Sequence, residues 1–247
     1  MKDTQTYCHN CGAAVSGNFC SHCGQRSSIN KVTFKETFQD IAENFFSINA
    51  PFFKTLKLLF TNPGKLFRDY LQGKRKTYYK PVSFFVLITV LYLIIRAIIA
   101  YDPFQNATIT VTDDTQSQLL TKARNFMLLN IDKFLFLFVF YLGVLLKLFF
   151  YKRYFIAEYL AIGFYLAGIY TLFTTLNMFY VTYVNPNFQF FAMLTMAIYF
   201  CYAMVSLFQR KKVFTLLKSI MVFFMAIFAY GMTAFALSYL IILLKNT

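Results

Sequence analysis

The sequence contains no tryptophan, and only 10 of its 247 residues are acidic. Charged residues of either sign make up 14% of the chain, whereas 58% of it is hydrophobic. An average soluble protein is about 25% charged. Intrinsic disorder is excluded, because a disordered chain combines low hydrophobicity with a high charge density. The composition instead predicts an all-α polytopic membrane protein.

The sequence motifs of the common catalytic sites are also missing. There is no H-E-x-x-H, no P-loop and no G-x-S-x-G, the patterns that indicate metalloproteases, nucleotide binding and nucleophilic hydrolysis. Both histidines precede residue 23, and proline is absent from every apolar segment described below. The proline-broken helices of many transporters are therefore not evident. These absences predict a protein that is not an enzyme.

Cysteine is concentrated at one end of the chain, where four of the five residues form two C-x-x-C pairs. Each pair is followed by glycine, and the second pair repeats the first after twelve residues. Two such turns supply four thiolates in a tetrahedron, the arrangement that structural Zn²⁺ prefers. The predicted ligands are Cys8, Cys11, Cys20 and Cys23.

Other interpretations of the four cysteines are iron in a rubredoxin-like site and, in an oxidising compartment, two disulfides. His9 and His22 are alternative ligands, but we interpret them as exposed spacer residues. We expect Tyr7 and Phe19 to pack beside the site. The segment from Tyr7 to Gln25 resembles the short zinc ribbons found near the N-termini of many bacterial proteins. A site closed by four cysteines has no open position for catalysis, so the sequence predicts structural zinc.

Five apolar segments are near or above the roughly 20 residues with which a helix crosses a membrane. They are Val82–Tyr101, Phe134–Tyr151, Ala157–Tyr180, Phe188–Phe208 and Ser219–Leu244. No long apolar run precedes them, so we expect no signal peptide. The predicted domains are a zinc ribbon at 1–28, amphipathic juxtamembrane helices at 29–81 and a five-helix transmembrane domain at 82–247.

Basic residues alternate between the segments that connect these spans. Residues 1–81 carry twelve Lys and Arg, and the turns at 152–153 and 210–212 are also basic. The segment 102–133 has three basic and four acidic residues. The positive-inside rule then places the N-terminus in the cytosol and the C-terminus outside. The cysteines would lie in the reducing compartment, where thiols are free to bind metal.

The juxtamembrane segment carries three helix starts. Thr33 and Glu36 form a capping-box pattern, Pro51 marks a second start, and Asn62 precedes a proline at a third, which Gly73 can end. Aromatic side chains on one face and Lys/Arg on the other suit the anionic headgroups of the cytoplasmic leaflet. Packing as a collar on the bundle is the alternative. Nucleic-acid binding is not expected, because the ribbon itself is nearly neutral.

Three polar residues within the predicted spans are candidates for a function, because ionisable groups are costly in a bilayer. Arg96 lies near the outer end of the first span, where it can snorkel or meet Asn177 of the third span. Glu158 opens the third span, where a helix N-terminus favours an anion. We expect structural roles for Arg96 and Glu158. A small-molecule or lipid transporter that uses all three residues is the alternative function.

The order of these elements resembles a family of bacterial inner-membrane proteins without an assigned activity. The resemblance rests on the ribbon, the stretch PFFKTLKLLFTNPGK at 51–65 and YKPVSFF at 79–85. It implies an architecture and a place in the bacterial cytoplasmic membrane. The predicted topology is also similar, more loosely, to the Yip family. We expect an integral membrane protein whose cytosolic ribbon docks a protein partner or organises assembly.

Overall fold

The computed structural model describes residues 6–27, 50–101, 115–130, 133–188, 191–209 and 211–246, and the helix expected at Thr33 lies outside them. Two short strands, β1 (Thr6–Tyr7) and β2 (Ala14–Val15), form an antiparallel pair in the ribbon. The helices are α2 (Ala50–Thr61), α3 (Pro63–Leu71), α4 (Pro81–Ile99), α5 (Thr115–Leu129), α6 (Leu135–Phe149), α7 (Ile156–Tyr183), α8 (Phe191–Phe208) and α9 (Lys212–Asn246), with a 3₁₀ turn η1 (Pro186–Phe188) between α7 and α8.

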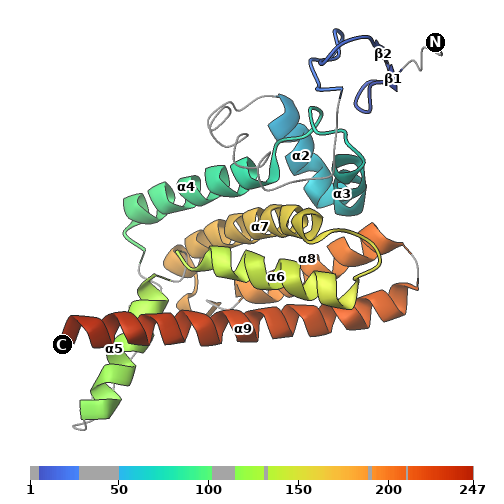
Figure 1. Ribbon diagram of the computed structural model, residues 1–247. Coiled ribbons are helices and arrows are strands. Elements are labelled where there is room, and N and C mark those ends of the chain that lie inside the picture. The colour runs from blue at the N-terminus through green and yellow to red at the C-terminus, as the bar shows by residue number, and fades with distance from the viewer. Residues whose placement is uncertain are drawn as a thin grey trace.

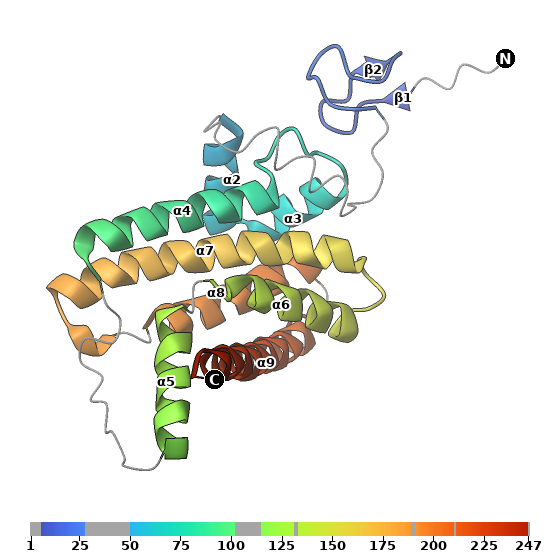
Figure 2. The same cartoon turned by 60° about the vertical axis from the view of Figure 1, so that its left-hand side comes forward.

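Helices α4, α6, α7, α8 and α9 lie side by side as a bundle (Figures 1 and 2). Four of them are long and apolar enough to cross a membrane: Pro81–Ile99, Ile156–Tyr183, Phe191–Phe208 and Lys212–Lys245. These helices confirm the prediction of a multi-pass, all-α membrane protein. The last helix begins before the predicted start at Ser219, because the basic turn after α8 runs directly into it.

Helix α6 is shorter than the span predicted at 134–151. It has 15 residues, so it is about 22 Å long at 1.5 Å per residue. The helix ends at Phe149 because the chain then turns toward α7. The Tyr159 hydroxyl donates to the Phe150 carbonyl at 2.8 Å, and the Lys147 ammonium donates to the Tyr151 carbonyl at 2.7 Å. The described residues thus contain four membrane-length helices and a shorter apolar helix beside α7 and α9.

The juxtamembrane helices α2 and α3 pack against the bundle. Tyr165 of α7 is fully buried, and the rings of Phe67, Tyr70 and Phe84 surround it at centroid distances of 6.1, 5.8 and 5.9 Å. At the other end of α3, a Cβ on Gly64 would lie 2.2 Å from the Ser206 backbone. Only glycine allows α3 to approach α8 so closely. Helices α2 and α3 share one hydrophobic core with the bundle. They therefore pack on it as a collar, which was the alternative expected from the sequence.

Helix α5 was not predicted from the sequence. It crosses the C-terminal part of α9 at a steep angle (Figure 1), buries Ala123, and places Phe126 under the Lys245 ammonium at 5.6 Å. Its first turn, Thr-Gln-Ser-Gln, gives no hydrophobic periodicity. Packing on α9 therefore stabilises a helix that neither composition nor pattern reveals.

Candidate metal centre and its contact with the helical domain

The two C-x-x-C turns have the same backbone geometry. In the first, the Gly12 N–H donates to the Cys8 carbonyl at 2.8 Å, and in the second the Gly24 N–H donates to the Cys20 carbonyl at 2.8 Å. The two glycines have φ angles of 77° and 68°, a left-handed conformation that a side chain would disfavour. The Cys8 and Cys20 N–H groups donate to the residues that follow each glycine. The twelve-residue repeat of the sequence is thus a structural repeat.

The repeat brings all four predicted metal ligands together. Their sulfur atoms lie within 4.8 Å of one another. The distances from Cys8 to Cys23 and from Cys11 to Cys20 are both 3.6 Å between Sγ atoms, far above the roughly 2.05 Å of a disulfide bond. Within residues 6–27 the cysteines are free thiols, and His9 and His22 are exposed. Four convergent thiols fit a metal ion of tetrahedral preference.

Electrostatics make the metal-free cluster hold one negative charge more easily than several. Burial alone would raise the pKa of Cys8, but the N–H groups of Cys11 and Asn10 and the neighbouring thiols lower it to about 7. At Cys11 the Ala13 N–H lowers the pKa, but burial and the three other thiols raise it to about 12. A cation bound among the sulfurs would remove this repulsion, so metal binding must displace protons.

The aromatic residues of the ribbon are largely exposed and do not form a buried core around the cysteines. Tyr7 is 62% exposed and Phe19 is 58% exposed, with the Arg26 guanidinium over the Phe19 ring at 5.8 Å. The described ribbon consequently has no apolar side-chain core besides its buried cysteine sulfurs.

The ribbon contacts the loop that joins α3 to α4 through a buried glutamine. The Gln25 side-chain amide donates to the Gly73 carbonyl at 2.9 Å and accepts from the Lys76 N–H at 3.1 Å. A second contact joins the Thr77 hydroxyl to the Asn10 side-chain oxygen. Gln25 directly follows Gly24, so the turn that presents Cys23 also positions the amide. No pattern in the sequence linked this residue to the loop.

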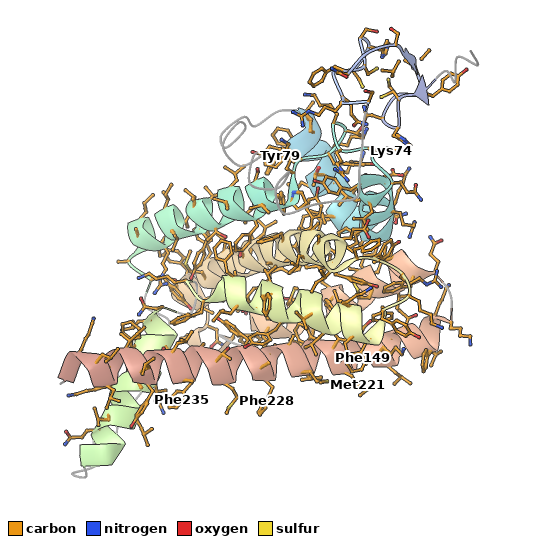
Figure 3. The ribbon with its side chains drawn as sticks, in the orientation of Figure 1. Lys74, Tyr79, Phe149, Met221, Phe228 and Phe235 are labelled. Carbon is orange, nitrogen blue, oxygen red and sulfur yellow. The ribbon has the colours of Figure 1, made fainter. Side chains whose placement is uncertain are left out.

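The loop at 73–80 is in turn fixed to three helices. Its Tyr79 N–H donates to the Thr55 hydroxyl of α2 at 2.8 Å, and its Tyr79 carbonyl accepts from the Tyr165 hydroxyl of α7. Lys74 forms a 3.0 Å ion pair with Asp69 of α3, and Figure 3 labels Lys74 and Tyr79 beside α2 and α3. The ribbon therefore rests on a loop that is part of the packed helical domain.

Asp69 connects the start of this loop to its end. Its carboxylate accepts from the Lys74 ammonium and from the Tyr78 hydroxyl, the latter at 2.8 Å. Burial raises the pKa of Asp69, but these two hydrogen bonds together lower it by more than burial raises it. The pKa of Asp69 therefore lies below its usual value. Burial of Tyr78 and its hydrogen bond to Asp69 raise the pKa of the Tyr78 hydroxyl. The loop is thus closed by a charged hydrogen-bond network next to the Gln25 contact.

The structure does not bring Arg96, Glu158 and Asn177 together. The Arg96 guanidinium donates to the Tyr101 carbonyl at 3.4 Å, in the turn that ends α4. The Asn177 amide donates to the Phe188 carbonyl of η1 at 3.2 Å. Glu158 accepts from the Phe155 N–H at 2.8 Å at the start of α7, about 28 Å along the helix from Asn177. Glu158 therefore lies far from Asn177, so the three residues do not form one site, and the contact between Arg96 and Asn177 stays a prediction.

Several cations of this region bind the carbonyl ends of helices, a role that the sequence analysis missed. The Arg68 guanidinium donates to Ser206 and Leu207 at the end of α8, at 2.6 and 3.0 Å. The Lys218 ammonium donates to the Phe149 carbonyl at the end of α6 at 2.9 Å. A helix C-terminus carries a partial negative charge, which a cation stabilises. Part of the basic excess therefore holds helix ends together.

Comparison with known proteins gives one match. Residues 50–93 are similar to a family described as "Protein of unknown function (DUF3667)". These residues comprise α2, α3, the loop that contacts Gln25, and the first part of α4. No curated protein and no solved structure matches, so the resemblance to the Yip family stays a prediction. The region similar to the family includes the loop on which the ribbon rests.

Proposed function

We propose that the four cysteines hold a structural Zn²⁺ and that the metal-bound ribbon organises the assembly of the cytosolic side of this membrane protein. The observation that carries the proposal is the Gln25 contact, because it joins the metal-binding turn directly to the loop at 73–77. Through Thr55, Asp69 and Tyr165 this loop contacts α2, α3 and α7. Metal binding then fixes the ribbon and the ordered loop at 73–77 on helices that their own packing already holds in place.

Zinc is favoured over iron because the proposed role is structural. Both metals accept four thiolates, but zinc has no redox chemistry and holds its geometry in a reducing compartment. A ribbon without an apolar core depends on such a metal, which contributes roughly 10–16 kcal/mol of folding free energy in zinc peptides. Metal analysis of the purified full-length chain identifies the ion. One equivalent of zinc would support the proposal, and iron with a thiolate-to-iron absorption band would contradict it.

The location we propose is the bacterial cytoplasmic membrane, with the ribbon in the cytosol and the end of α9 outside. The α6–α7 turn, the α8–α9 turn and the start of α4 lie at one end of the bundle (Figure 1). Lys152, Arg153, Lys211 and Lys212 lie in or beside the two turns. This clustering agrees with the positive-inside rule, and it requires α6 to cross the membrane. A topology reporter fused at Asn246 should be active only outside the cytosol.

Anionic lipid headgroups are the second interaction that we propose on this side. The outward face of α2 exposes Phe53 and Phe60 together with Lys54 and Lys57. Aromatic side chains that enter the bilayer surface beside lysines suit an in-plane helix. The exposed rings of Tyr7 and Phe19 offer a surface to a protein partner. The amount of anionic lipid that co-purifies with the full chain should fall when Lys54 and Lys57 are both changed to Gln.

Hydrogen exchange of the full-length chain tests the assembly role. We expect removal of the metal by a chelator to increase exchange at the Lys76 amide, which loses its acceptor when the ribbon unfolds. Core amides of α7, such as that of Leu166, should stay protected because apolar packing holds them. Unchanged protection of residues 73–77 after metal loss would contradict the proposal.

A further inference from the structure

Helix α5 lies across the bundle. The long helices run across the view in Figure 1, whereas α5 stands steeply in both Figure 1 and Figure 2. It packs on α9, and its Ala123 is fully buried. A helix that crosses a membrane-spanning helix at a steep angle runs along the plane of the membrane. Helix α5 therefore does not accompany α9 through the bilayer.

The uncharged part of α9 shows the level at which α5 crosses it. Residues 219–244, between Lys218 and Lys245, contain no Lys, Arg, Asp or Glu. This stretch is about 39 Å long, and the hydrocarbon layer is about 30 Å thick. The Lys218 ammonium binds the carbonyl end of α6, and the Lys245 ammonium lies over the Phe126 ring of α5 at 5.6 Å. Helix α5 thus contacts α9 where α9 leaves the hydrocarbon, at the membrane surface.

The two sides of α5 that flank its contact with α9 differ in chemistry. Leu120 is 43% exposed, and Lys122 is also exposed. Two residues along a helix, these side chains point about 160° apart, so they lie on opposite sides of α5. Met127 follows Leu120 by seven residues and therefore shares its side. One side of α5 is thus apolar and the other carries a lysine.

The charge of α5 also suits a membrane surface. The helix contains no Asp or Glu, and its two cations, Lys122 and Arg124, are exposed. Arg124 follows Leu120 by four residues, so it lies close to the apolar side. A long arginine side chain can lay its stem along acyl chains while its guanidinium reaches a phosphate. Helices with apolar side chains on one face and cations beside them are held in the plane of a bilayer surface.

From these features we propose that α5 is an in-plane helix that binds the phospholipid leaflet at the C-terminal end of α9. Leu120 and Met127 enter the acyl region, and Arg124 reaches the lipid phosphates. Lys122 faces the water. Because α5 packs on α9, this contact also holds the end of α9 at a fixed depth, and it needs neither the metal nor the ribbon.

Fluorescence of an introduced tryptophan tests the position of α5, because the chain has no tryptophan of its own. The full-length variants are reconstituted in vesicles of phosphatidylcholine and phosphatidylglycerol. The quenchers are phosphatidylcholine brominated near the headgroup end of its chains, the same lipid brominated near the chain ends, and iodide on both faces of the vesicles. Leu120→Trp should lose most of its emission to the lipid brominated near the headgroup and little to iodide. Lys122→Trp should lose emission to iodide instead, and Met127→Trp should follow Leu120→Trp.

Phe228→Trp supplies the reference for depth. Phe228 is 71% exposed on α9, about 15 Å along the helix from Lys218, and Figure 3 shows it pointing away from the bundle. It should be quenched most by the lipid brominated near the chain ends. The proposal would be overturned if Leu120→Trp behaved like Phe228→Trp, since α5 would then lie inside the hydrocarbon. Quenching of Leu120→Trp and Met127→Trp by iodide as strong as that of Lys122→Trp would overturn it as well, and so would emission that no quencher reaches.

Discussion

The ribbon and the helical bundle are stabilised by different means. In the described ribbon the buried side chains are Cys8, Cys20 and Gln25, and its aromatic rings are exposed. The bundle buries large apolar side chains, with Tyr165 among three aromatic rings. Between helices in a bilayer such side chains contribute through van der Waals packing, a source of stability that the ribbon lacks. One chain therefore contains a part whose stability we attribute to the proposed metal and a part that depends on packing.

The contact between the two parts is small and polar. Gln25 makes two hydrogen bonds to the loop, and Asn10 accepts one more. Three hydrogen bonds contribute only a few kcal/mol in total. The ribbon should therefore unfold without unfolding the bundle, and damage to the bundle should leave the metal site intact. The predictions below test this independence.

The largest effect is expected from Cys20→Ser. Serine is a poor zinc ligand, so the ribbon should lose its metal and most of the roughly 10–16 kcal/mol that binding supplies. Metal analysis and hydrogen exchange of residues 6–27 measure both losses. The control is Cys201→Ser in α8, which should keep the metal. If Cys20→Ser also lowered the thermal stability of the bundle, the two parts would not be independent.

A smaller effect, confined to the bundle, is expected from Gly64→Ala. The added Cβ would lie 2.2 Å from the Ser206 backbone, and the helices must separate at a cost of about 3 kcal/mol. Gly231→Ala is the matched change, because its Cβ meets nothing within 4 Å and alanine favours a helix. Thermal unfolding in detergent should rank Gly231→Ala above the wild type and Gly64→Ala below it. Zinc content should be the same in all three.

The sequence predicted the parts of the fold that local patterns determine. The repeat of C-x-x-C and glycine predicted the cysteine cluster, and Asn62 with Pro63 predicted the start of α3, where the Asn62 side chain accepts from the Lys65 N–H at 3.0 Å. Long-range contacts could not be predicted. Gln25 and Gly73 are 48 residues apart, and no periodicity relates a glutamine amide to a distant carbonyl.

The features of the fold that the sequence did not predict correctly also depend on long-range contacts. Apolar length alone extended the predicted second span to Tyr151. Hydropathy does not indicate that Lys147 and Tyr159 donate hydrogen bonds to the carbonyls that follow the end of α6. Polar composition concealed α5, whose stability comes from α9. The packing of α2 and α3 depends on Gly64 meeting Ser206, a contact across 142 residues. Tertiary contacts decided these features, and single-sequence patterns do not contain them.

Gln25→Ala should separate the ribbon from the loop while both stay folded. Loss of the amide leaves the Lys76 N–H and the Gly73 carbonyl to water, at a cost of about 2 kcal/mol. Exchange of the Lys76 amide should accelerate by roughly thirtyfold, which corresponds to that free energy. Gln72→Ala is the control, since Gln72 is exposed in the same loop. An unchanged Lys76 exchange rate would show that Asn10 and Thr77 alone hold the ribbon.

The smallest expected effect is the pH dependence of the ribbon's affinity for the metal. The pKa of Cys8 is lowered to about 7, so above this pH the metal-free cluster already carries one thiolate, and metal displaces no proton from it. Below this pH the thiolate is protonated, and binding must release one more proton. The apparent affinity should therefore fall an additional tenfold per pH unit below about pH 7, in a chelator competition followed from about pH 8 to about pH 6. A slope that did not steepen in this range would place the first ionisation of the cluster elsewhere. The thermal stability of the bundle in metal-free protein should not follow this slope, because its buried core has no part in the proton release.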